Sequence, residues 1–379
     1  MFHPYKSAAK YTHAAFLQDP TIGTPVFVRF STVAGGAGLA DLPRDVHRFA
    51  TKFYTSDGIF DLVGNNIPVF FTNQHASTPD TFWDFISLAP ESLHRVMWVM
   101  SDRAIPRSYR MMEGFGVHTF RMIDAKGHAT FIKWHWRPML GTQSVRWNEA
   151  VKIDQADQDF HHRDLFTSIQ NIRFPAWELS IPPIAEDEVH DLDVDIFDPT
   201  KLIREEQIPL VPIGKMVLDR WQNHFFAETE HTAFYPGQIV PGIELVNDPR
   251  LQRRVSSYAH TAAERLGATH HDQPELRHTE HSLHDLPRKG LAPVPIDEDR
   301  AHHRTDRSDH YSQARMFWRS MIPPEQRHIA SAFTFELSKV EAPAIRRRML
   351  GHLHLIAPEL GGLVAGALGM METAPHRSR

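Results

Sequence analysis

The sequence predicts an α+β protein in which an antiparallel β-barrel or sandwich carries inserted helices. Three observations predict this class. Apolar residues alternate at a period of two in several segments of the first two hundred residues. Segments with helical spacing lie between some of these strands. A further region, from 323 to 370, repeats apolar residues three to four apart. Antiparallel strands with helices inserted between them favour a barrel or a sandwich with helical additions.

The strands are expected early in the chain. Residues 26–31 alternate between apolar and other side chains with the period of a half-buried strand. Four further apolar runs are predicted strands: 59–63, 67–71, 117–123 and 129–136. Gly64-Asn65-Asn66 separates the first two of these runs as a predicted turn, and residues 124–127 separate the last two as a predicted hairpin loop.

Helices are predicted at three places. Residues 80–88 and 91–100 have helical spacing, and Thr78-Pro79 supplies an N-cap followed by proline. Residues 248–266 form a third helix, which Gly267 ends. In the C-terminal region the apolar positions predict a helical hairpin or bundle; they are Phe333, Leu337, Val340, Met349, Leu353 and Ile356.

The chain divides into four predicted parts. Residues 1–197 form the β-barrel domain, and residues 198–267 form a proline-punctuated, extended wrapping arm that ends in the helix of residues 248–266. Residues 268–316 are polar and rich in histidine, which predicts a linker. Residues 317–379 form the C-terminal helical domain.

Composition excludes several classes of protein. The 379 residues contain no cysteine, so disulfide scaffolds, iron–sulfur clusters and thiolate-ligated haem are excluded. A net charge of -5 gives no electrostatic case for nucleic acid. No apolar run reaches the roughly 18 residues of a membrane span. The first six residues lack the pattern of a signal peptide, which favours a cytoplasmic location.

The pair Arg254 and Tyr258 carries the main chemical prediction. Four residues apart on a helix, the two side chains share one face. A guanidinium there can donate hydrogen bonds that stabilise a phenolate. A phenolate is a hard ligand that suits ferric haem iron. Taken alone the pair is weakly specific and is typical of a surface pair.

Several motifs in a fixed order make the pair specific. They are Thr24 to Gly38, Asp61 to Phe71, Arg110 to Phe120, Phe225 to Glu230 and Pro236 to Gly242. Together with the segments 325–329 and 333–339, this order resembles the haem catalase family, and the helical tail resembles its large-subunit type. The resemblance covers residues 2–267 and resumes from 317 to 370. It implies a catalase-like antiparallel β-barrel, an extended wrapping arm and a C-terminal helical domain.

The resemblance assigns a role to individual residues. Tyr258 would ligate the iron of a b- or d-type haem, and Arg254 would be its hydrogen-bond partner. Arg29 and Arg265 would pair with haem propionates, a suitable match of guanidinium and carboxylate. On the other side of the haem, Asn65 would hydrogen-bond the peroxide. Two further residues would line the haem pocket, Ser31 beside the distal imidazole and His118 in the wall. Without the resemblance, Asn65 fits a tight turn and His118 fits a satisfied core histidine.

The resemblance also implies the reaction: two hydrogen peroxide molecules become two waters and dioxygen. It implies a homo-oligomer, a tetramer in the family. The family's distal histidine lies upstream of the segment that matches Phe2 to Ser7, and Ser256 and His260 replace the phenylalanine and aspartate of the family's ligand motif. Two alternatives to the catalase reaction therefore stand beside it: a catalase-like haem protein with weak peroxidase activity, and a non-catalytic remnant or interaction subunit.

Overall fold

A ten-stranded antiparallel sheet forms the centre of the molecule in the computed structural model, which describes residues 1–32, 40–70, 78–230, 232–246, 248–266 and 309–370. The strands are β1 (Phe2–Pro4), β2 (Val26–Thr32), β3 (His47–Thr55), β4 (Gly58–Asn65), β5 (Gly114–Ile123), β6 (Ala129–Pro138), β7 (Ala176–Ile181), β8 (Ile184–Ala185), β9 (Val211–Val217) and β10 (Ile243–Leu245). Their order is β1-β9-β7-β6-β5-β4-β3-β2, with β8 paired to β6 and β10 paired to β5.

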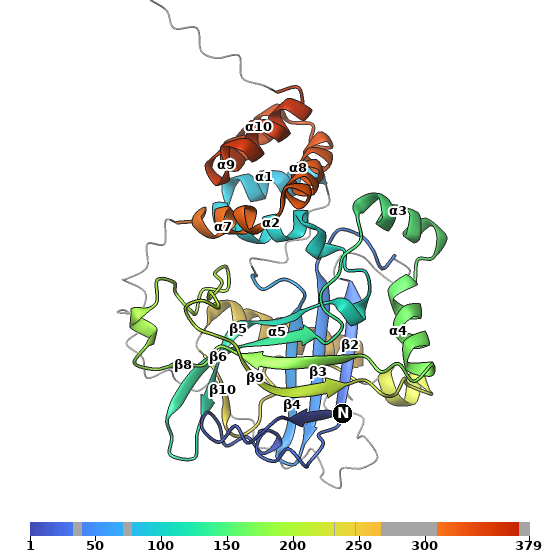
Figure 1. The fold of residues 1–379 in the computed structure, drawn as a ribbon, viewed down its shortest axis with the longest axis vertical. Helices are drawn as coiled ribbons and strands as arrows, with labels where there is room; N and C mark the ends of the chain where they lie inside the picture. The colour runs from blue at the N-terminus through green and yellow to red at the C-terminus, as the bar shows by residue number, and fades with distance from the viewer. Residues whose placement is uncertain (33–39, 71–77, 231, 247, 267–308, 371–379) are drawn as a thin grey trace, which may run out of the picture.

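The sheet curls into a nearly closed barrel (Figure 1). Its two ends meet where Phe2 in β1 exchanges backbone hydrogen bonds of 2.8 Å with Thr24, just before β2. The barrel interior is aromatic: Phe49, Phe53 and Trp136 stack with interplanar angles below 15° between Trp136 and each phenylalanine. A closed sheet leaves no long free edge. The predicted α+β class, with a β-barrel and inserted helices, is therefore confirmed.

The helices form a second layer of structure. They are α1 (Pro79–Leu88), α2 (Leu93–Met100), α3 (Trp147–Ala156), α4 (Phe160–Gln170), α5 (Pro249–Leu266), α7 (Ser312–Ser320), α8 (Pro323–Ser338), α9 (Pro343–Ile356) and α10 (Pro358–Ala367). Figure 1 shows α1 and α2 among the C-terminal helices, above the barrel. These six helices share one hydrophobic core, which joins segments more than two hundred residues apart.

The helix predictions agree with the structure. Thr78 caps α1 by accepting a hydrogen bond from the backbone of Thr81, with proline in the first turn. The third predicted helix corresponds to α5. All six apolar positions predicted for the C-terminal bundle are fully buried: Phe333, Leu337, Val340, Met349, Leu353 and Ile356.

Two strand predictions differ from the structure. The tripeptide Gly64-Asn65-Asn66 is not a turn between strands, because Gly64 and Asn65 complete β4 and pair with β3 and β5. A side chain at Gly64 would collide with the backbone of Phe115, so glycine permits this close pairing. Residues 67–70 form no strand; Phe70 instead donates its backbone N–H to Pro199 at 2.8 Å.

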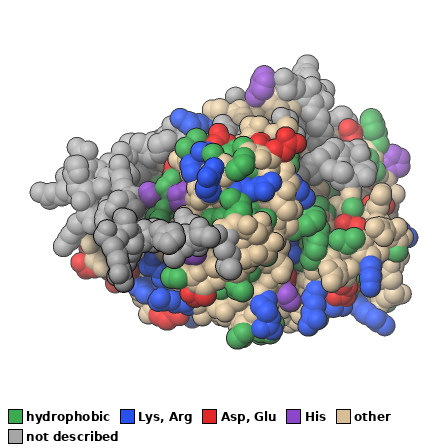
Figure 2. Space-filling model, turned by 90° about the horizontal axis from the view of Figure 1, so that it is seen from above, with side chains coloured by type: hydrophobic (Ala, Val, Ile, Leu, Met, Phe, Trp, Pro, Cys, Tyr) green, Lys and Arg blue, Asp and Glu red, His purple; other side chains and the backbone are tan. Residues whose placement is uncertain are grey.

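Part of the predicted arm also lies in the barrel. β9 pairs with β7 and β1 in the sheet. Most of the predicted histidine-rich linker, residues 268–308, lies outside the described residues, whereas α7 begins within the rest of it. Among the helices that the structure describes, none is long and apolar enough to cross a membrane. On the face drawn in Figure 2, basic and acidic side chains are interspersed.

Candidate functional site

The outer face of β2, β3 and β4 brings the predicted site residues together. Strand register places residues directly opposite one another on the same face, and alternate residues of a strand share that face. Across the three strands the rows are Ser31, Arg48 and Asn65; Arg29, Ala50 and Val63; and Phe27, Lys52 and Asp61. The opposite face points into the aromatic core of the barrel, where Phe49 and Phe53 lie. The sheet therefore separates a packed interior from a polar outer face.

Asn65 is buried at the end of β4. Its Oδ1 accepts the backbone N–H of Ile67 at 2.9 Å, which fixes the orientation of the amide and leaves its Nδ2 group as a donor. Ser31 lies on the same row, two strands away in β2. Its hydroxyl oxygen is buried without a hydrogen-bond partner among the described residues. Both predicted residues are thus polar groups with unused hydrogen-bonding capacity on one sheet face.

Helix α5 positions Tyr258 against this face, behind the strands in the view of Figure 1. Leu251 and Val255 anchor the helix to the barrel core. Tyr258, three residues after Val255, lies on the same side of the helix and packs against a small apolar cluster that includes Ala50 and Val63. The predicted proximal tyrosine therefore packs on the sheet face that bears the predicted distal residues, against the row next to theirs.

Arg254 lies one turn before Tyr258, as its spacing predicts. Its guanidinium carbon is 5.8 Å from the centroid of the Tyr258 ring and 5.4 Å from that of Phe70. The guanidinium stacks on these aromatic faces, a contact that suits its planar charge. No hydrogen bond joins it to the Tyr258 oxygen among the contacts that the structure describes. The pair is brought together, but through the ring rather than through the phenol oxygen.

His118 is held by an acid that sequence reasoning missed. Its Nδ1 donates to Asp248 Oδ2 at 2.6 Å, and both side chains are at most 4 % exposed. Burial holds the pKa of His118 below its usual value, although Asp248 opposes the shift. The neutral ring then has an unprotonated Nε2, which is buried without a partner among the described residues. His118 is thus hydrogen-bonded at Nδ1 and has an acceptor to offer at Nε2.

A cluster around Phe70 links these groups. The ring of Phe70 lies 6.2 Å from that of His118, and the guanidinium carbons of Arg95 and Arg254 lie 5.1 and 5.4 Å from its centroid. Burial lowers the pKa of Arg95 to about 10, and Arg254 acts in the same direction. Two arginines and a neutral histidine thus surround one aromatic ring beside Tyr258. Arg95 gave no signal in the sequence, because it lies within an ordinary helical pattern.

The remaining predicted residues are placed less fully. Arg29 lies on the middle row of the sheet face and is exposed. Arg265 lies in the last turn of α5, and its side chain is outside the described residues. The structure places Ser31 and Asn65 on one row of the sheet face, and it places Arg254 and Tyr258 on the helix that packs against this face.

The donor set fits a haem. A phenol on α5 packs on the sheet face whose polar row includes the unpartnered Ser31 Oγ, and the unpartnered His118 Nε2 belongs to the cluster around Phe70. Buried polar atoms are rarely left without partners, and a bound group on this sheet face would supply one to the Ser31 hydroxyl. Tyr258 would hold the iron, Arg29 would face a propionate, and Asn65 would lie on the opposite side.

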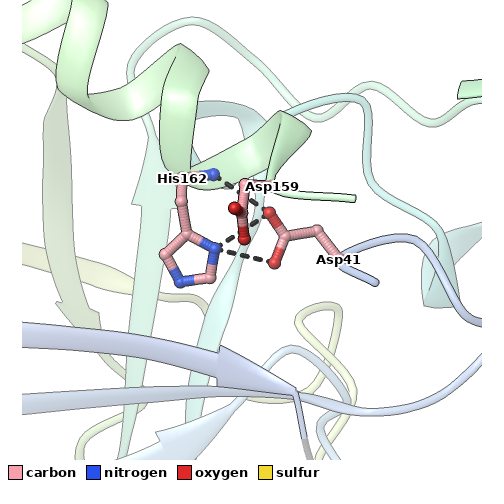
Figure 3. Close-up of side chains that lie close together, drawn as sticks. All are labelled: Asp41, Asp159 and His162. Atoms are coloured by element: carbon pink, nitrogen blue, oxygen red, sulfur yellow. Dashed lines mark hydrogen bonds and ion pairs between the residues drawn. The ribbon is translucent and has the colours of Figure 1, made fainter. Parts of the chain in front are cut away.

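A second group of titratable residues lies away from this layer, at the start of α4 (Figure 3). Asp41, Asp159 and His162 bring three possible ligand atoms within 4.8 Å of one another. Asp41 already accepts the backbone N–H groups of His161 and His162 at 3.0 and 3.1 Å and the ring of His162 at 2.7 Å. The two backbone hydrogen bonds cap the helix, and the hydrogen bond from the ring to Asp41 raises the pKa of His162. The group therefore has a sufficient structural explanation.

Comparison with known proteins identifies the family. The sequence model of the catalase family matches residues 1–81 and 72–310, and that of the catalase-related immune-responsive domain matches residues 304–368. Catalase C of Rhizobium meliloti is 48% identical over 99% of this chain, catalase HPII of Mycobacterium avium 46% over 98%, and catalase-2 of Bacillus subtilis 43% over 100%. The chain spans 60%, 60% and 63% of the lengths of these relatives. These matches bear out the predicted resemblance, and the chain belongs to the catalase family.

Proposed function

We propose that this protein is a haem-dependent catalase that converts two hydrogen peroxide molecules into two waters and dioxygen. The observation that carries the proposal is the placement of Tyr258 and Arg254 on α5 against the sheet face that bears Ser31 and Asn65. A bound ferric haem supplies the redox chemistry of the reaction. The similarity to curated catalases over nearly the whole chain supports the same assignment.

Each residue of the site has a proposed task. Tyr258 ligates the iron, and the nearby positive charge of Arg254 favours its phenolate form. His118, fixed by Asp248, presents an acceptor nitrogen beside Phe70, the ring that Arg254 also contacts. On the opposite side, Asn65 donates from Nδ2 to a peroxide oxygen, because its Oδ1 is already engaged by the backbone. Arg29 and Arg265 bind the propionates.

The first test is haem binding. The full chain is reconstituted with haem and titrated by absorption, with Tyr258→Phe and Arg254→Ala beside the unaltered protein. We expect a Soret band in the unaltered protein, its loss or a marked change in Tyr258→Phe, and about 10- to 100-fold weaker haem binding in Arg254→Ala. Oxygen release from hydrogen peroxide is then measured on the reconstituted protein.

Two variants control for non-specific effects. Tyr5→Phe removes the same hydroxyl from a tyrosine that is 45% exposed, and Arg253→Ala removes an exposed arginine beside Arg254 on α5. Both are expected to behave as the unaltered protein does. A chain without a Soret band after reconstitution would disprove the proposed function. So would a haem-loaded chain that releases no oxygen above the background of free haem.

The setting of the enzyme is proposed on the same basis. We place it in the cytoplasm as a homotetramer, the assembly that the family resemblance implies. Light scattering on the purified protein tests the assembly: a tetramer has about four times the chain mass of 43.5 kDa. A mass equal to that of one chain at micromolar concentration would contradict it.

A further inference from the structure

Arg48 occupies the centre of the polar row on the outer sheet face. It pairs in register with Ser31 on one side and with Asn65 on the other, so the three side chains leave the sheet on the same face. Two positions further along the strands, this face carries Ala50 and Val63, against which Tyr258 packs. Arg48 therefore lies on the sheet face that Tyr258 packs against, one row away from the residues that the tyrosine contacts.

The charge of Arg48 has no counterion in the part of the chain that the structure describes. The side chain is half-buried, and it takes part in no ion pair or hydrogen bond with any described residue. Its neighbours on the row are neutral. By contrast, Arg110 is paired with Asp164 at 2.7 Å, and Lys52, four residues after Arg48 on β3, is paired with Asp61 at 2.7 Å. An unpaired cation beside two neutral polar groups is an arrangement that suits an anion.

We propose that Arg48 binds the anionic form of the distal ligand, the hydroperoxide ion in the reaction and small anions in its place. This inference rests on the proposed function. The deprotonated oxygen lies against the guanidinium, Asn65 donates to the other oxygen, and the proton that hydrogen peroxide loses passes to solvent water. Arg48 takes up no proton, because a guanidinium stays charged. It acts as a positioning and charge-stabilising group, and it is not an acid–base catalyst.

The porphyrin carboxylates are the other anions that Arg48 could bind at such a site. Its position in the row favours the distal ligand over these carboxylates. Arg48 lies directly between Ser31 and Asn65, whose side chains can donate to a small oxygen anion. Arg29 lies on the neighbouring row and is exposed, as suits a group that meets a carboxylate at the rim. The two assignments predict different losses when Arg48 is neutralised, so one experiment separates them.

Fluoride is the probe, because it binds ferric haem as an anion and accepts hydrogen bonds. The full chain is reconstituted with haem, and the fluoride Kd is measured from the absorption change for Arg48→Ala, Arg48→Gln and Arg48→Lys. Arg173→Ala, which removes an exposed arginine of the loop before β7, is the matched control. Haem affinity is measured on every variant.

We expect the fluoride Kd to rise about 10- to 100-fold in Arg48→Ala and Arg48→Gln, the loss of one hydrogen bond to a charged group. Arg48→Lys should recover part of the affinity, and Arg173→Ala should match the unaltered protein. Haem affinity should change less than twofold. An unchanged fluoride Kd in the two neutral variants overturns the inference while the proposed function stands. A loss of haem affinity without a change in fluoride affinity reassigns Arg48 to a propionate and overturns it too. A chain that takes up no haem overturns both.

Discussion

Replacing Lys52 with methionine tests what holds the outer sheet face in place. Lys52 and Asp61 are fully buried, and the lysine Nζ lies 2.7 and 2.8 Å from the two carboxylate oxygens. Asp61 Oδ2 also accepts the backbone N–H of Tyr235 at 2.8 Å, and Lys52 lies over the ring of Phe234. Phe234 belongs to the cluster on which Tyr258 packs. The ion pair thus fixes the segment that supports the proposed ligand.

The cost of Lys52→Met follows from what remains behind. Removal of the lysine leaves Asp61 buried with only one backbone donor, and an uncompensated buried charge costs about 3–5 kcal/mol of unfolding free energy. Burial already raises the pKa of Asp61 in the presence of Lys52, and the removal of Lys52 raises that pKa further. The folded state then binds a proton that the unfolded state releases. The deficit therefore grows as the pH rises and is smaller at pH 5 than at pH 8.

Urea unfolding at pH 5 and pH 8, followed by far-UV circular dichroism, measures this deficit. Lys152→Met, which alters an exposed lysine on α3, should leave the midpoint unchanged. The double variant Lys52→Met, Asp61→Leu removes both charges and should recover more than half of the loss, although Tyr235 loses its acceptor. The reasoning is refuted if Lys52→Met unfolds within about 1 kcal/mol of the unaltered protein at pH 8. It is also refuted if the double variant is as unstable as the single one.

Two further predictions concern the helical part. Burial lowers the pKa of His94 to about 4, and its Nε2 accepts the Trp98 N–H at 3.2 Å, so protonation breaks that bond. As the pH falls, the unfolded state binds the proton first. The stability that is present above about pH 6.5 is therefore lost toward pH 4, by up to ~3 kcal/mol. His94→Gln should flatten this pH dependence of the unfolding free energy in urea titrations, and an unchanged pH dependence would argue against the assignment to His94. Phe333→Ala, at a fully buried ring beside Trp83, should cost about 3–5 kcal/mol by the same assay, and a loss below about 1 kcal/mol would show that the site collapses.

Local patterns predicted the helical elements well because each depends on residues close in sequence. Thr78 caps α1 through a neighbour three residues away. The apolar residues of α8 and α9 recur with the helical period, and the same residues are the ones that are buried in the structure. That α1 and α2 join the C-terminal helices depends instead on packing across more than two hundred residues, and no local pattern encodes it.

The site was predictable only in part, for the same reason. The spacing of Arg254 and Tyr258 lies within one helix, and the family resemblance named Asn65 and Ser31. The acid that holds His118 is 130 residues away from it in sequence, so only the fold reveals the pair. Asn65 shows the limit of local rules: Gly-Asn-Asn fits a turn, but strand register places this asparagine at the end of a strand instead.

Strand β3 carries two cations, Lys52 and Arg48, that differ in whether an acid neutralises them. Lys52 is fully buried and its charge is matched by Asp61, as a buried ammonium requires. Arg48, four residues earlier on the same face, is half-buried, and the described part of the chain supplies no acid for it. A neutral side chain between Ser31 and Asn65 would give a more stable fold than a half-buried cation without an acid. Groups that reduce stability in this way concentrate at functional sites. The lysine therefore belongs to the scaffold, whereas the arginine belongs to the ligand that the layer is built to receive.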